Sequence, residues 1–181
     1  MNQSLIYETA RLIIKKTTLE DADFIFELLN TPKWSQFIGD RNIRNIEDAE
    51  AYIQNTILPV IKKNGYGNFT VFRKSDDLKI GCCGLYDREG VEGIDIGFAF
   101  LPQYEGLGYA FESAFKIKEV ALKDFKLDKL SAITNRNNIG SQKLLEKLDL
   151  RFEKEIRLPN TKDALLLYVW EFNYLDDALT K

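Results

Sequence analysis

The chain has 181 residues, of which 45% are hydrophobic, and a formal net charge of −3. This size and composition predict one folded domain over residues 1–181 rather than a disordered segment. The small negative charge provides no basic footprint for nucleic acid, and no apolar run approaches the roughly 18 residues of a membrane span. Residues 1–4 carry no charged-then-apolar signal, so a cytoplasmic protein is expected.

The chain contains no histidine and two cysteines. The missing histidine excludes Ser-His and Cys-His nucleophiles as well as an imidazole base. Cys82 and Cys83 are adjacent in an expected strand, where neighbouring side chains point to opposite faces. We expect both to be buried small hydrophobes, with a reactive thiol as the alternative. So few soft ligands predict no metal site.

The first part of the chain predicts a strand followed by two helices. The strand spans residues 12–16, and Thr18 is suited to cap the helix that follows it. Asn45 is suited to cap a second helix over residues 46–63. Pro59 lies late in that helix, so a kink or an early end is expected there.

Hydrophobic periodicity predicts alternating strands and helices through the rest of the chain. The expected strands are residues 68–73, 78–86, 93–101, 129–134, 151–155 and 165–173, and the expected helices are residues 109–125 and 139–148. The resulting order, βααβββαβαββ, predicts an α/β fold: a mixed sheet of about seven strands with helices on both faces.

The turn between the strand at residues 93–101 and the helix at residues 109–125 contains Gly106 and Gly108. Two glycines let the backbone approach a ligand and direct several free N–H groups at one point. The positive end of the following helix favours an anion there, such as the phosphate or pyrophosphate of a nucleotide cofactor. A dinucleotide fingerprint needs a small residue where Phe111 stands, and a P-loop needs a Gly-Lys dipeptide that the chain lacks.

Three motifs in order resemble the GNAT superfamily of N-acetyltransferases. Gln103, Gly106 and Gly108 match its phosphate loop, written Gln/Arg-x-x-Gly-x-Gly/Ala. Residues 138–148, NIGSQKLLEKL, resemble its Asn-x-x-Ser…Leu-Glu-Lys segment. Residues 8–12, ETARL, are similar to the start of the RimJ/RimL-type branch, which includes ribosomal-protein N-terminal acetyltransferases. Together the resemblance covers roughly residues 8–173.

The resemblance implies acetyl-CoA as the cosubstrate. The residues that would hold its pyrophosphate, largely through backbone N–H groups, are Gln103, Gly106, Leu107, Gly108, Tyr109 and Ala110. The pantetheine arm would pair with the strand like an added strand at Phe98, Ala99 and Phe100, and a backbone N–H near Phe98 or Ala99 would polarise the thioester carbonyl. The plain alternatives are an ordinary glycine turn and two core aromatics.

Asn138 resembles the family residue that contacts the cofactor at the start of the last helix, and it would equally serve as a helix N-cap. Ser141 resembles a polar position near the thiolate leaving group, although a surface serine explains it as well. Many members of the family have a tyrosine that acts as the general acid four residues after this serine, and Leu145 occupies that position here. The glycine that usually follows the Leu-Glu-Lys-Leu run is replaced by Asp149.

Asp95 is the first candidate for the general base, because it occupies the acidic position of the family's Glu-Ile-Gly-like strand segment. A solvated strand residue beside a basic neighbour is the alternative. Tyr168 and Glu153 are lesser candidates on flanking strands. Trp34 and Phe37, in or after an expected loop at residues 31–34, are candidates to line the acceptor pocket or to cover the core. Tyr168 is a third candidate for the acceptor pocket.

The implied reaction transfers an acetyl group from acetyl-CoA to a primary amine by direct attack in a ternary complex. An α-amino group, with a pKa near ~8, loses its proton more readily than a lysine near ~10.4, which favours a protein N-terminus or a small amine. A non-catalytic CoA-binding sensor and a plain interaction domain are the alternatives. The acceptor itself and the oligomeric state stay open, because acceptor pockets are built from variable loops.

Overall fold

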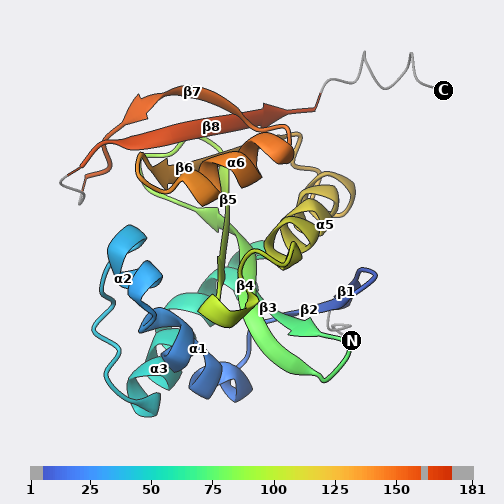
Figure 1. The fold of residues 1–181 in the computed structure, drawn as a ribbon, viewed down its shortest axis with the longest axis vertical. Coiled ribbons are helices and arrows are strands. Elements are labelled where there is room, and N and C mark those ends of the chain that lie inside the picture. The colour runs from blue at the N-terminus through green and yellow to red at the C-terminus, as the bar shows by residue number, and fades with distance from the viewer. Residues whose placement is uncertain (1–5, 160–162, 173–181) are drawn as a thin grey trace.

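The computed structural model describes residues 6–159 and 163–172, so residues 1–4 and Asn173, on which two of the expectations above rest, lie outside the described chain. Within it, eight strands form one sheet: β1 (Ile6–Glu8), β2 (Leu12–Lys16), β3 (Asn68–Arg73), β4 (Leu78–Asp87), β5 (Ile94–Phe100), β6 (Lys129–Asn135), β7 (Arg151–Ile156) and β8 (Leu165–Glu171). Their order is β1-β2-β3-β4-β5-β6-β8-β7. Figure 1 shows β5 at the centre, between the β1–β4 half and the β6–β8 half.

The predicted mixed sheet is confirmed, with one strand more than expected. The additional strand, β1, pairs antiparallel with β2 from Ile6 opposite Lys15 to Glu8 opposite Ile13. Three residues are too short to display a period-2 pattern, so this strand forms only because β2 offers a free edge. The only parallel pair in the described sheet is β5 with β6.

The helical segments are η1 (Leu19–Asp21), α1 (Ala22–Leu29), α2 (Pro32–Phe37), α3 (Ile46–Tyr52), η2 (Ile53–Ile57), α4 (Leu58–Asn64), η3 (Pro102–Tyr104), α5 (Tyr109–Lys123) and α6 (Ile139–Lys147). The helix expected after Asn45 is divided into α3, the π-helical turn η2 and α4. Pro59 lies in the first turn of α4, where its missing N–H costs little. The π turn immediately before it accommodates the break in the α-helical hydrogen bonding.

The loop expected at residues 31–34 is wrong, because the short helix α2 begins there. Thr31 is its N-cap and accepts a hydrogen bond from the Trp34 N–H, and Pro32 occupies the first helical position. A Thr-Pro pair is a recognised start signal, since the cap satisfies a free N–H and proline has none to satisfy. The consequence is that Trp34 and Phe37 project from a helix and not from a loop.

The core is divided between the two faces of the sheet. The larger cluster joins the sheet to α5 and α6 and includes Cys83, and the smaller one joins it to α1, α3 and η2 and includes Cys82. The prediction that adjacent cysteines are buried on opposite faces is therefore confirmed. Burial raises the pKa of both thiols to about 12, which keeps them protonated and unreactive.

The turn after α6 keeps its glycine-like conformation without glycine. Asp149 has a φ of +66°, in the left-handed region that aspartate tolerates better than most residues. The buried Lys118 amine donates to the Leu148 carbonyl oxygen at 2.5 Å and lies 3.4 Å from Asp149 Oδ2. This lysine stabilises the end of α6 by donating a hydrogen bond to a carbonyl oxygen that has no partner within the helix.

Candidate functional site

The predicted anion-binding turn links β5 to α5 through the short η3 helix. Gly106 and Gly108 have φ values of +71° and +84°, so both occupy the left-handed region that favours glycine. Gly108 is the N-cap of α5, and the first intrahelical bond runs from the Glu112 N–H to its carbonyl. No described residue accepts a hydrogen bond from the backbone N–H groups of residues 108–110. These donors, at the positive end of a 15-residue helix, form a site suited to an anion.

The side chains of this turn differ in exposure. Gln103 and Leu107 are exposed, Ala110 is half-buried, and Tyr109 is buried against the larger core cluster. Tyr109 therefore anchors the first turn of α5, while the loop before it stays open to solvent. The chemistry that the turn offers comes from its peptide groups, as its glycines predict.

A gap opens between the only parallel pair of described strands. The β5–β6 pairing consists of Ile94 with Leu130 and Asp95 with Ser131, after which the two strands separate. Residues 96–100 keep β4 as their neighbour on the other edge. The carboxyl ends of both strands lead into the first turns of α5 and α6, so the gap and the anion-binding turn lie at the same end of the sheet.

Peptide groups of β5 line this gap. Leu101 donates its N–H to the Ile80 oxygen at 3.0 Å, and alternate residues of an antiparallel pair face the partner strand. The peptide groups of Gly97 and Ala99 therefore face β4, whereas those of Phe98 and Phe100 face the gap. Between the two oxyanion donors considered from the sequence, this alternation favours the Phe98 N–H. The aromatic rings of Phe98 and Phe100 pack in the larger core cluster.

Helix α6 begins just after the carboxyl end of β6, the second strand that borders the gap. Asn138 is its N-cap, and its side-chain oxygen accepts a hydrogen bond from the Ser141 N–H at 3.2 Å. The capping role left open by the sequence is thus present, and the two amide N–H donors of Asn138 stay available to a ligand. Leu145 is 1% exposed within the larger core cluster, so it fills space and brings no polar group to this helix.

Asp95 lies at the apex of the gap, at the last residue of β5 that pairs with β6. Its carboxylate is 2% exposed and accepts hydrogen bonds from Arg88 Nε at 3.0 Å and from the Ile133 N–H at 3.2 Å. Burial raises its pKa to about 6, which outweighs the attraction of the Arg88 guanidinium. The Arg88 guanidinium lowers the Asp95 pKa only weakly because its side chain is 35% exposed, so that solvent screens its charge. The carboxyl group is therefore suited to exchange a proton near neutral pH.

The sequence analysis missed a tyrosine next to this carboxylate. Tyr86 stands opposite Asp95 in the β4–β5 register, and its hydroxyl donates to Asn68 Oδ1 at 2.5 Å. A Cβ on Gly84 would lie 2.6 Å from the Tyr86 oxygen, and one on Gly97 would lie 3.0 Å from its ring. The two glycines therefore leave room for the Tyr86 ring to lie across the sheet. Glycines inside a strand indicate such a close approach, so Gly84 and Gly97 are the sequence signal that could have pointed to Tyr86.

Helix α2 lies on the smaller-cluster side of the sheet and is tied to the anion-binding turn. Lys33 forms an ion pair with Glu105, the residue before Gly106. Trp34 packs against the smaller cluster, and its buried Nε1 has no hydrogen-bond partner among the described residues. Phe37 is half-buried at the end of the same helix. An indole N–H without a partner indicates a position that a ligand or water would fill.

Tyr168 does not lie in the same core cluster as Trp34. It is 3% exposed on β8, belongs to the larger core cluster, and stacks edge-on with Phe152, with ring centroids 5.9 Å apart. Trp34 packs instead against the smaller cluster. Trp34 and Tyr168, two of the three aromatic candidates for the acceptor pocket, therefore lie in different core clusters.

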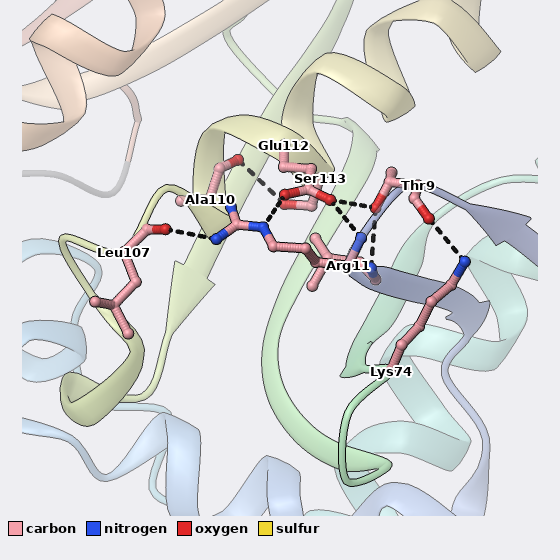
Figure 2. A network of polar contacts seen from close by, with 8 residues as sticks. Thr9, Arg11, Lys74, Leu107, Ala110, Glu112 and Ser113 are labelled. Atoms are coloured by element: carbon pink, nitrogen blue, oxygen red, sulfur yellow. Dashed lines mark hydrogen bonds and ion pairs between the residues drawn. The ribbon is translucent and has the colours of Figure 1, made fainter.

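A network from the N-terminal hairpin supports the anion-binding turn (Figure 2). The Arg11 guanidinium donates from Nη1 to the Leu107 carbonyl at 3.0 Å and from Nε to Glu112 Oε2 at 2.7 Å. It also lies over the Tyr109 ring, 4.4 Å from the ring centroid. Thr9 and the Arg11 N–H donate to the other Glu112 oxygen at 2.6 and 2.9 Å. A surface groove of about 500 Å³ borders this network.

Within residues 6–159 and 163–172, neither a metal-binding cluster nor a membrane-spanning helix is found. No group of three or more His, Cys, Asp or Glu side chains is arranged to hold a metal ion. No helix in these ranges has the length and apolarity needed to cross a membrane.

Comparisons with known proteins agree on one family. The acetyltransferase (GNAT) domain family matches residues 11–151. An N-acetyltransferase of Bacillus subtilis (strain 168), YnaD, is 28% identical over 145 residues, which are 80% of this chain and 82% of that protein. This relative is itself uncharacterized.

Solved structures show the same fold at low sequence identity. The ribosomal-protein-S5-alanine acetyltransferase of Vibrio fischeri superimposes with a TM-score of 0.79 at 17% identity, covering 94% of this chain and 98% of that one. RimL, a ribosomal L7/L12 α-N-protein acetyltransferase in complex with coenzyme A, gives a TM-score of 0.76 at 14% identity, covering 93% and 98%.

Proposed function

The chain belongs to the acetyltransferase (GNAT) domain family and is an acyltransferase, and on that premise we propose that it transfers the acetyl group of acetyl-CoA to a primary amine. The acceptor would be a protein N-terminus or a small amine, in the cytoplasm. The observation that carries the proposal is the gap between β5 and β6, which opens after Asp95 and ends at the unpaired N–H groups of residues 108–110.

These features match the parts of acetyl-CoA in order. The N–H groups at residues 108–110 suit the pyrophosphate, with Gln103 and Gly106 on the approach to them. The peptide groups of Phe98 and Phe100 suit the amides of the pantetheine arm, which would add to the edge of β5 like a strand. The thioester would then lie near Phe98, with Asn138 across the gap on α6.

The proposed chemistry is direct attack in a ternary complex. The amine nitrogen forms a bond to the acetyl carbon, the carbonyl oxygen becomes an oxyanion held by the Phe98 N–H, and the C–S bond then breaks. The amine loses its proton to Asp95 through a water molecule, because Arg88 and Ile133 already occupy the carboxylate oxygens. Ser141 is proposed to supply the proton that the leaving thiolate takes up.

The acceptor is proposed to approach from the side of α2, where Trp34 offers an unpaired indole N–H. A base whose pKa is about 6 is a weak one for an ammonium group. It suits an α-amino group, near ~8, better than a lysine, near ~10.4. The proposal therefore favours N-terminal and other weakly basic amines over lysine side chains.

Calorimetric titration with acetyl-CoA tests the proposal first, with NADH and ATP as controls. Thiol release would then be measured with two matched peptides: one with a free N-terminus and no lysine, the other with a blocked N-terminus and one lysine. We expect selective acetyl-CoA binding and faster release with the free N-terminus. Absence of acetyl-CoA binding would refute the proposal, and faster release with the lysine peptide would refute the acceptor class.

A second candidate is a CoA-binding sensor that does not catalyse transfer. The observation in its favour is Leu145, which is buried in the core at the position where the family resemblance implies a tyrosine acting as general acid, so Ser141 alone remains to protonate the thiolate. A sensor would bind acetyl-CoA with the same selectivity and yet release no thiol above the uncatalysed rate at any acceptor concentration.

A further inference from the structure

One arginine from the N-terminal hairpin reaches the anion-binding turn, 96 residues later in the chain. Arg11 contacts three parts of that turn: the Leu107 carbonyl, the Tyr109 ring and the Glu112 carboxylate. Figure 2 shows the guanidinium lying between Leu107 and Glu112. No other described side chain hydrogen-bonds to the Leu107 carbonyl.

The contact with Leu107 determines the direction of a neighbouring donor. A trans peptide points its C=O and the next N–H in opposite directions. Because Arg11 holds the Leu107 oxygen, the Gly108 N–H points away from the guanidinium, toward the open side of the turn. Without this contact the Leu107–Gly108 peptide would rotate more easily, since glycine imposes little restriction on its own φ.

The fit between Arg11 and the turn depends on Gly108. A Cβ at this position would lie 3.2 Å from Arg11 Nη2, which is closer than ordinary van der Waals contact. Glycine is therefore favoured at this position by its φ of +84°, and a Cβ there would also require the guanidinium to shift by a few tenths of an ångström. The guanidinium also contacts the Tyr109 ring, so such a shift would disturb this contact as well.

Arg11 also balances a charge that would oppose an anion. Glu112 lies in the first turn of α5, and although its burial acts in the opposite direction, the hydrogen bonds from Thr9 and Arg11 lower its pKa. An ionised carboxylate one turn from the free N–H groups repels a phosphate. The Arg11–Glu112 pair offsets this repulsion, so the helix end keeps its positive character.

We propose that Arg11 is a positioning residue for the cosubstrate: it orients the Leu107–Gly108 peptide and neutralises Glu112, so that the start of α5 is preorganised for the acetyl-CoA pyrophosphate. The inference rests on the proposed function. It predicts that the energetic contribution of Arg11 is tied to the phosphates of the donor and not to the acetyl transfer step or the acceptor.

The test compares two acetyl donors. Acetyl-CoA carries the pyrophosphate, whereas S-acetylpantetheine carries the same thioester arm without any phosphate. In Arg11→Ala we expect the dissociation constant for acetyl-CoA to rise about tenfold or more, the loss typical of a hydrogen bond to a charged group. The ratio of kcat/KM for acetyl-CoA to that for S-acetylpantetheine should fall by a similar factor, with kcat at saturating acetyl-CoA little changed.

Two variants keep the result interpretable. Arg44→Ala removes a matched surface arginine that pairs with Asp40 through two hydrogen bonds, and it should leave the donor ratio unchanged. Arg11→Lys keeps the charge but cannot reach Leu107 and Glu112 in the same fork, and we expect an intermediate ratio. If Arg11→Ala does not fold, the donor ratio of Arg11→Lys carries the test.

An equal loss with both donors would overturn the inference, because it would show a general structural role for Arg11. An unchanged dissociation constant for acetyl-CoA in Arg11→Ala would overturn it as well. Failure of the wild-type protein to bind acetyl-CoA would instead refute the proposed function, so the two failures are distinguishable.

Discussion

The Asp95→Asn substitution should change how stability depends on pH. In the folded chain burial raises the pKa of this carboxyl group from 3.8 to about 6. Between these pH values the unfolded chain has released the proton while the folded chain retains it. Raising the pH therefore favours unfolding, so the stabilisation from protonated Asp95 is complete below about pH 4 and lost above about pH 6.

The magnitude follows from the two pKa values. Their difference, at about 1.36 kcal/mol for each pKa unit, corresponds to roughly 3 kcal/mol of unfolding free energy in total, of which roughly 2 kcal/mol is lost as the pH rises from about 4 to 7. Asparagine does not titrate, so Asp95→Asn should not lose this contribution. It keeps an oxygen for the Ile133 N–H, and its other effects on stability shift the curve equally at each pH.

Urea unfolding of both proteins at half-unit steps from pH 4 to pH 8 measures the effect. The unfolding free energy of Asp95→Asn minus that of the wild type should rise by roughly 2 kcal/mol across this range. Subtracting one curve from the other cancels the contributions of all the carboxyl groups that the two proteins have in common. A difference that stays constant with pH would show that the Asp95 pKa is not raised, and the reasoning from burial would be refuted.

The same variant tests the proposed base. The wild-type kcat/KM for the acceptor should fall below about pH 6, where Asp95 becomes protonated, while Asp95→Asn should be slower and lack this acid limb. Its dissociation constant for acetyl-CoA should be unchanged. Transfer at the wild-type rate across the pH range would remove Asp95 from the mechanism.

Three further substitutions follow from the backbone. Gly108→Trp should abolish acetyl-CoA binding in calorimetry, because its side chain enters the turn at a left-handed residue. Asp149→Gly should raise the unfolding free energy by about 0.5–1 kcal/mol in urea titrations. Relief of the left-handed conformation should exceed the loss of the 3.4 Å ion pair with Lys118, in which the Asp149 carboxylate is 78% exposed and Lys118 keeps its hydrogen bond to the Leu148 carbonyl. Gly81→Ala should destabilise by about 1–3 kcal/mol in the same assay, because its Cβ would lie 2.4 Å from the Phe100 ring.

Gly108→Trp and Asp149→Gly each have a control within the chain. Gly65→Ala also alters a left-handed glycine, at the end of α4, and should lower stability while sparing acetyl-CoA affinity. Asp149→Ala retains the strain and loses the carboxylate, so it should be less stable than the wild type. Tight acetyl-CoA binding by Gly108→Trp, or a destabilised Asp149→Gly, would contradict the backbone argument.

The sequence by itself determined the features that depend on neighbouring residues. The glycines of the anion-binding turn adopt the left-handed conformation they predict, Asn138 caps α6, and Cys82 and Cys83 occupy opposite faces of β4. Each of these follows from the allowed backbone angles of one residue, a hydrogen bond within a few residues, or the period of a strand. The predicted strand and helix order has the same local origin.

Only the tertiary structure decided where the sheet opens and what supports the opening. The last pair between β5 and β6 is fixed by Asp95, whose side chain accepts the Ile133 N–H from the separating strand. Arg11 reaches Leu107 across 96 positions, and Tyr86 reaches Asn68 on a neighbouring strand. Such contacts leave no period or spacing in the sequence, because their partners are brought together by the packing of the whole sheet and not by the local chain.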